Sequence, residues 1–149
     1  MIKRVLPIAI IAALGMLAGC KESAQETADD VAEARAEATK DVAEERADVV
    51  KAQAETTKEV AQESADGDLD GALDAQADGA KDVADEKYDV AIAAAKGRYD
   101  TSMEQCDAFQ GDQKDACQDQ AESTYESEKS IAESDHDRAV ADADRIDGD

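Results

Sequence analysis

The sequence contains very few of the side chains that form a deep hydrophobic core. Among 149 residues there is no Trp, one Phe, one His and one Pro. Only 18 large apolar side chains (Val, Ile, Leu, Met, Phe and Tyr) lie between residues 21 and 149, and alanine is the commonest apolar residue there. Ordering each residue costs roughly 1 to 2 kcal/mol, and the burial of large side chains must offset that cost. An α/β enzyme with a deep core is therefore excluded.

Positive charge is also scarce. Lys and Arg number 16 against 38 Asp and Glu, which leaves a formal net charge of −22. Because Lys3 and Arg4 both lie near the N-terminus, the chain after residue 20 has a net charge of −24. Proteins that bind nucleic-acid phosphates need a basic face, so we expect no nucleic-acid partner. A strongly acidic chain attracts cationic proteins or peptides and divalent cations instead.

Residues for catalysis are missing as well. The single histidine, His136, lies between Asp135 and Asp137, and we expect it to be solvated on a charged helix. Most histidine-dependent metal sites need a second histidine, and a serine nucleophile needs a base and an oxyanion hole provided by a core. No Gly-rich phosphate loop is present. We therefore predict a protein that is not an enzyme, with no catalytic residues, no cofactor and no metal.

Residues 1–19 have the parts of a secretory signal. A short cationic segment with Lys3 and Arg4 precedes an apolar run from Val5 to Leu14, and small residues follow. The run is too short for a membrane span of roughly 20 residues. Leu17-Ala18-Gly19-Cys20 resembles the lipobox of bacterial lipoproteins. An ordinary cleaved signal with an incidental cysteine is the alternative.

The lipobox resemblance implies a membrane anchor. In this family the thiol of the lipobox cysteine, here Cys20, carries a diacylglyceryl group, and its amino group carries a further acyl chain such as palmitate. Three acyl chains anchor a protein firmly, at about 0.8 kcal/mol per buried methylene. Residue 21 is Lys and not the Asp that retains many such proteins in the inner membrane. The expected location is the outer membrane, facing the periplasm.

Residues 20–65 are predicted to form one long helix after the lipidated N-terminus, because no Pro or Gly occurs between Glu22 and Ala65. An eleven-residue unit spans 30–40 and is repeated in 41–51. Valines recur on one narrow stripe, at Val31, Val42, Val49 and Val60. Such a period favours a straight or slightly right-handed coiled coil. The pattern resembles the helical repeats of late-embryogenesis-abundant proteins, which implies a chain that becomes helical on drying or against a surface.

Residues 66–80 are predicted to be an acidic hinge, since three glycines interrupt any continuous helix there. Positions 1, 3, 5, 6 and 9 of an EF-hand calcium loop are matched by Asp66, Asp68, Asp70, Gly71 and Asp74. Position 12, which needs a bidentate carboxylate, is Ala77. We interpret the segment as a solvated acidic turn, and the alternative is a calcium site formed by Asp66, Asp68, Asp70 and Asp74.

Residues 81–146 are predicted to form a helical hairpin with its turn near residues 107–114, followed by a tail at 147–149. Apolar residues recur at spacings of three and four, at Tyr88, Ile92, Ala95, Tyr99, Met103 and Cys106. In the second helix one side carries Ala121, Tyr125, Ala132, Ala139, Ala143 and Ile146, with Ile131 and Val140 beside it. We expect these two faces to meet.

Cys106 and Cys117 are expected to form a disulfide in an oxidising compartment. Positions eleven apart on one helix are separated by about 16 Å, whereas a disulfide needs Cα atoms within about 7 Å. A bridge within one chain therefore requires a reversal between the cysteines, with Gly111 in the left-handed conformation and Phe109 over the apolar seam. A bridge between two chains and two free thiols are the alternatives.

The segment from Cys106 to Cys117 also resembles a cysteine-bracketed turn in uncharacterised alanine-rich periplasmic proteins of proteobacteria, a family with no established activity. The sequence as a whole predicts an all-α protein, with a long alanine-rich helix or coiled coil and a disulfide-pinned antiparallel hairpin. Its narrow Ala and Val stripes favour a homo-oligomer. The expected function is structural or stress-protective in the cell envelope. The alternative is an acidic binding module for a cationic envelope partner or divalent cations.

Overall fold

A computed structural model describes residues 23–147, and these residues form three α-helices. They are α1 (Ala24–Asp66), α2 (Leu69–Cys106) and α3 (Asp112–Asp147), and no strand occurs between residues 23 and 147. The predicted all-α fold is confirmed. The signal peptide and the lipobox cysteine, Cys20, lie outside the described residues.

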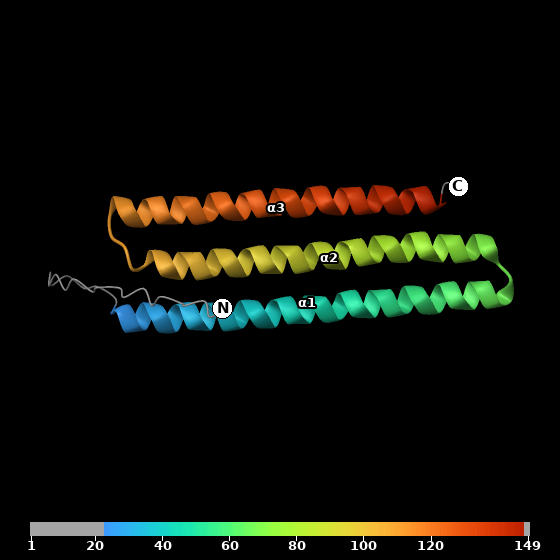
Figure 1. The fold of residues 1–149 in the computed structure, drawn as a ribbon, viewed down its shortest axis with the longest axis horizontal. Helices are drawn as coiled ribbons and strands as arrows, with labels where there is room; N and C mark the ends of the chain where they lie inside the picture. The colour runs from blue at the N-terminus through green and yellow to red at the C-terminus, as the bar shows by residue number, and fades with distance from the viewer. Residues whose placement is uncertain (1–22, 148–149) are drawn as a thin grey trace, which may run out of the picture.

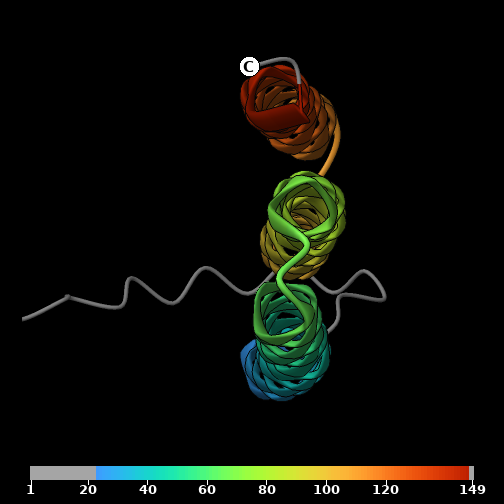
Figure 2. The ribbon, with the colours of Figure 1, turned by 90° about the vertical axis from the view of Figure 1, so that its right-hand side faces the viewer.

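The three helices lie side by side in a single flat layer in the order of the chain (Figures 1 and 2). α2 runs antiparallel to both neighbours and contacts both, whereas α1 and α3 share no contact over residues 23–147. The sequence leaves open whether the long N-terminal helix packs on the hairpin, and in the structure it does. α2 folds back along α1 over most of the length of both helices. Both broad faces of the layer remain open.

The connection between α1 and α2 is much shorter than the predicted hinge. Gly67 ends α1 in the left-handed conformation with φ of 82°, which a residue with a Cβ rarely adopts. Asp68 then caps α2, because its Oδ1 accepts a hydrogen bond of 2.8 Å from the amide of Gly71. Residues 69–80, which were expected to be non-helical, form the first three turns of α2. The predicted start of the second helix at Lys81 is wrong for the same reason.

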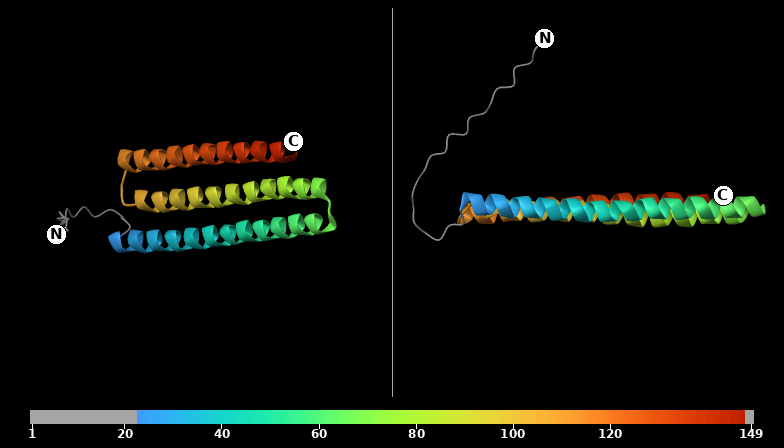
Figure 3. Two further views of the ribbon diagram at one scale, coloured as in Figure 1. Left: turned by 45° about the vertical axis from the view of Figure 1, so that its right-hand side comes forward. Right: turned by 90° about the horizontal axis from the view of Figure 1, so that it is seen from below.

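The eleven-residue period predicted for the first helix governs side-chain burial in α1 and α3. Half-buried or buried positions of α1 recur every eleven residues, for example Thr27, Ala38, Val49 and Val60, or Asp30, Asp41, Ala52 and Glu63. In α3 the same spacing joins Lys114, Tyr125 and His136, and also Ala121, Ala132 and Ala143. Eleven residues complete three helical turns, so each contact line runs nearly parallel to its helix axis. Straight helices in a flat layer follow from this geometry (Figure 3).

The residues that are buried between the helices are small. The buried apolar residues are Ala52, Ala72, Ala77, Ala84, Ala95, Cys106, Ala121, Ala132 and Ala143. A Cβ added to Gly97 would lie 2.3 Å from the Cβ of Ala38, and one added to Gly79 would lie 2.2 Å from the Thr56 side chain. Since no larger side chain than Cys106 is fully buried between residues 23 and 147, the layer is held by close backbone approach.

Candidate functional site

The turn between α2 and α3 is closed by the predicted disulfide. Cys106, the last residue of α2, is bonded to Cys117 of α3, and their Cα atoms are 5.6 Å apart. Gly111 has the expected left-handed conformation, with φ of 56°, directly before α3. Lys114 Nζ lies 2.6 Å from Asp107 Oδ1 and closes the turn a second time. Of the three pairing alternatives, the bridge within one chain is the one that forms.

Phe109 does not cover the apolar seam as expected. Its side chain is 45% exposed, because α2 ends at Cys106 and Phe109 lies in the connection beyond the helix contacts. Cys106 is fully buried and Cys117 is half-buried. The disulfide is therefore a shielded structural cross-link.

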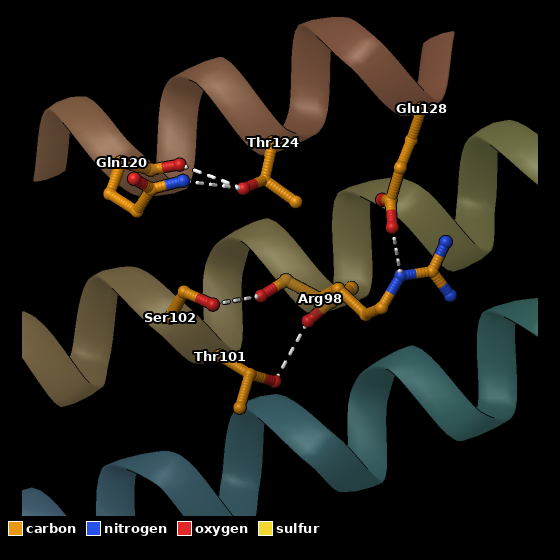
Figure 4. Close-up of polar contacts among 7 residues, drawn as sticks. Arg98, Thr101, Ser102, Gln120, Thr124 and Glu128 are labelled. Atoms are coloured by element: carbon orange, nitrogen blue, oxygen red, sulfur yellow. Dashed lines mark hydrogen bonds and ion pairs between the residues drawn. The ribbon is translucent and has the colours of Figure 1, made fainter. Parts of the chain in front are cut away.

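Polar pairs join α2 to α3 along the length of the two helices. Arg98 Nε donates a hydrogen bond of 2.9 Å to Glu128 Oε1 across the two helices (Figure 4), and Lys81 Nζ lies 2.9 Å from Asp144 Oδ1. The rings of Tyr99 and Tyr125 face each other with centroids 5.3 Å apart. The predicted meeting of the two apolar faces is confirmed, except that Ile131 remains 59% exposed.

His136 is not simply solvated. Its Nε2 lies 2.6 Å from Asp85 Oδ1 of α2, and its ring centroid lies 5.4 Å from that of Tyr88. The hydrogen bond to Asp85 raises the pKa of His136, and the charges of Asp85 and Asp137 add to that rise. Asp85 is 51 residues away in the sequence, so local spacing gave no sign of this pair.

A second polar cluster lies between α1 and α2. One carboxylate oxygen each from Glu45, Asp48 and Glu86 lies within 4.8 Å of the others. Burial raises the pKa of Glu86, and its acidic neighbours, Asp48 first among them, raise it further. These three carboxylates have a spacing that a divalent cation could bridge.

The four acidic residues that match an EF-hand loop do not form a loop between two helices. Asp66 is the last residue of α1, Asp68 caps α2, and Asp70 and Asp74 lie one turn apart within α2. An EF-hand needs a twelve-residue loop between its helices, and here only Gly67 and Asp68 separate them. The match of this segment to an EF-hand loop is therefore wrong.

The groove between α1 and α2 differs in charge on the two broad faces of the layer. On one face, which we call the arginine groove, the lining contains no carboxylate. Its residues are Arg35, Ala38, Thr39, Val42, Ala43, Arg46, Ala94, Gly97, Arg98, Thr101, Ser102 and Thr124. Arg35 and Arg46 occupy the same position in successive eleven-residue units, so the repeat by itself indicates that they share one face of the helix.

On the opposite face the same two helices form what we call the acidic groove. Six carboxylates line it, from Asp30, Glu33, Glu37, Asp41, Asp100 and Glu104. Lys96 is its one basic residue, and Lys96 Nζ is paired with Asp100 at 2.6 Å. Ala38 and Gly97 line both grooves, so the grooves lie back to back at the same level of the layer.

Comparison with protein-family models, with curated proteins and with solved structures finds no match to this chain. Within residues 23–147 no helix has the length and apolar character needed to cross a membrane.

Proposed function

We propose that this chain is a non-enzymatic, lipid-anchored protein of the outer membrane, facing the periplasm, with a structural or stress-protective role in the cell envelope. The observation that carries the proposal is the position of the N-terminal end of α1. Ser23 caps that end, only three residues after the lipobox cysteine, Cys20. The disulfide turn lies at the same end of the layer (Figure 1).

A lipid on Cys20 would hold the cross-linked end of the layer at the membrane. The far end, at Gly67, would then stand about 65 Å away, since α1 has 43 residues. Within residues 23–147 the three helices are straight and pack closely through alanine and glycine, so the layer is long and thin. These features favour a spacer or protective layer.

The anchor is tested by growth with labelled palmitate. The label should migrate with the wild-type chain and be absent from Cys20→Ser, because the thiol is the attachment point in the lipobox family. Equal labelling of both chains would contradict the anchor.

The structural role needs a separate readout. Cells that lack the chain should lose viability on drying or on detergent exposure, and the wild-type chain should restore it whereas Cys20→Ser should not. Survival that does not depend on the chain under either stress would contradict a protective role and leave the anchor standing.

An acidic binding module is the second candidate, and the acidic groove supports it. Its carboxylates outnumber its one lysine, and the chain as a whole carries −22. Calorimetric titration with a short oligolysine should give a complex at physiological salt that is lost as the Debye length shortens to about 3 Å at 1 M salt. Glu33→Gln with Glu37→Gln should weaken the complex more than the matched control, Glu122→Gln with Glu126→Gln on α3.

A further inference from the structure

The arginine groove is unusual in so acidic a chain. Asp and Glu make up 38 of 149 residues, yet none of the twelve residues that line this groove is acidic. Arg35 and Arg46 make no ion pair with any residue between 23 and 147. Arg98 has one partner, Glu128, at the α3 side. The groove therefore presents two uncommitted guanidinium groups on a floor of small apolar residues.

The face that complements this groove is present in the same molecule. Glu33, Glu37 and Asp41 line the acidic groove from α1 and recur at spacings of four, so they form a ridge along that helix. Arg35 and Arg46, eleven residues apart, cover a similar length of the same helix on the other face. A straight ridge of side chains fits a straight groove between two parallel axes. Both broad faces are open, because α1 and α3 have no neighbour beyond α2.

We propose that a second copy of this chain docks its acidic ridge (Glu33, Glu37 and Asp41) into the arginine groove of the first. Arg and carboxylate groups form paired hydrogen bonds that are stronger than neutral ones. Val42 and Ala43 on the groove floor lose contact with water in the same step. The contact joins two different faces, so it does not close on itself and repeated docking produces a stack of layers.

The net charge of −22 opposes this association only at long range. At physiological salt the Debye length is about 8 Å, so most charges on two facing layers are screened from each other. Arginine and carboxylate groups in direct contact are screened much less. The attraction between the arginine groove and the acidic ridge is therefore strongest at short range, when the two layers are in contact.

The test is sedimentation of the full chain as Cys20→Ser in non-ionic detergent, so that neither lipid nor a third thiol links the copies. At submillimolar concentration and physiological salt the weight-average mass should be at least about twice the single-chain mass, because the interface does not close. Arg35→Glu with Arg46→Glu should reduce it to the single-chain mass. The matched control, Lys40→Glu with Lys58→Glu, changes the charge equally outside both grooves and should leave the mass unchanged.

A charge-swap mixture makes the test specific to the two faces. Glu33→Arg with Glu37→Arg should also be a single chain alone, because its altered ridge repels an arginine groove. Mixed in equal amounts with the Arg35→Glu, Arg46→Glu chain, it should assemble again. A single-chain mass for the unmutated grooves, or mixtures that stay dissociated, would overturn the proposal. The proposal would also be overturned if the unmutated chain stays monomeric, binds anionic vesicles, and loses that vesicle binding on Arg35→Glu with Arg46→Glu.

Discussion

At the scale of single residues, glycine and alanine decide how closely the helices approach. Gly97 faces Ala38, and Gly79 faces Thr56, with no space for another Cβ at either point. Both pairs are separated by the same eighteen residues along α1 and along α2, so they define one antiparallel register. In an ordinary helix glycine costs about 1 kcal/mol relative to alanine. Here that cost is offset by contact that only glycine permits.

Gly97→Ala should destabilise the protein although it raises helix propensity. The added methyl group would lie 2.3 Å from Ala38 Cβ, a distance that requires the helices to move apart. Overpacking costs typically 1 to 3 kcal/mol, which exceeds the gain of about 1 kcal/mol in propensity. Urea unfolding followed by circular dichroism measures the difference.

Ala38→Gly combined with Gly97→Ala is the matched variant. It moves the methyl group across the contact without changing the total volume, so it should recover most of the loss. A double variant as unstable as Gly97→Ala alone would mean that the contact between these two residues is not the cause.

His136→Gln should remove a contribution to the free energy of unfolding that is present at low pH and absent at high pH. The folded-state pKa of His136 is raised, so the protonated imidazole stabilises the fold fully below the unfolded pKa of about 6.5 and loses that effect as pH rises through the raised value. The wild type should therefore exceed the variant in stability at pH 5.5 by more than at pH 9. Asp85→Asn serves as the second variant, and equal differences at both pH values would show that the pair does not titrate in this way.

At the scale of the elements, capping and closure decide where each helix begins and ends. Ser23 accepts a hydrogen bond from the Glu26 amide at 3.2 Å, and the Glu26 carboxylate accepts one from the Ser23 amide at 3.3 Å. Asp68 performs the first of these roles for α2. α3 differs from α1 because it packs on α2 alone and is joined to it by the disulfide between Cys106 and Cys117. The cross-link therefore contributes more to α3 than to α1.

Removal of the disulfide should loosen α3 first. Closing so short a loop stabilises the folded chain by roughly 3 kcal/mol in the chain-entropy account. Cys106→Ser with Cys117→Ser should lower the free energy of unfolding by about 2 to 3 kcal/mol. Hydrogen exchange should accelerate in α3 more than in α1. Uniform acceleration across all three helices would indicate that the layer unfolds as one unit and not from its α3 edge.

At the scale of the whole molecule, a flat layer spreads its charge over two open faces. The formal charge of −22 is distributed over residues that are mostly exposed, and few ion pairs join different helices. Self-repulsion of like charges destabilises a compact state. The single layer, without a second layer to cover either face, keeps those charges in water and limits that repulsion.

Salt should therefore stabilise the isolated chain. Between 0.01 and 1 M sodium chloride the Debye length falls from about 30 to about 3 Å, which screens the repulsion between carboxylates on neighbouring turns. We expect the free energy of unfolding in urea, at low micromolar concentration, to rise by about 1 kcal/mol over this range. The Lys40→Glu, Lys58→Glu chain is more acidic, so salt should raise its free energy of unfolding more than that of the wild type. A fall in stability with salt would mean that the exposed ion pairs dominate.

Local chemistry in the sequence was sufficient to predict much of the fold. The alanine-rich segment without Pro or Gly predicts α1, and the distance between Cys106 and Cys117 predicts a reversal at Gly111, because helix propensity and loop geometry act over a few residues. Because of Gly71 and Gly79, the sequence predicts a hinge where α2 in fact begins. Their cost to a helix is local, whereas the cap from Asp68 and the contact with Thr56 that offset it depend on neighbouring structure.

The sequence by itself determined three features of this protein: its helical character, its eleven-residue period and its disulfide turn. Only the tertiary structure decided that α1 packs on α2 and not on α3, that His136 meets Asp85, and that the arginines and the carboxylates occupy opposite faces. These features depend on the register between helices. That register is decided where backbones approach most closely, at Gly97 against Ala38 and at Gly79 against Thr56, and these partners lie far apart in the chain.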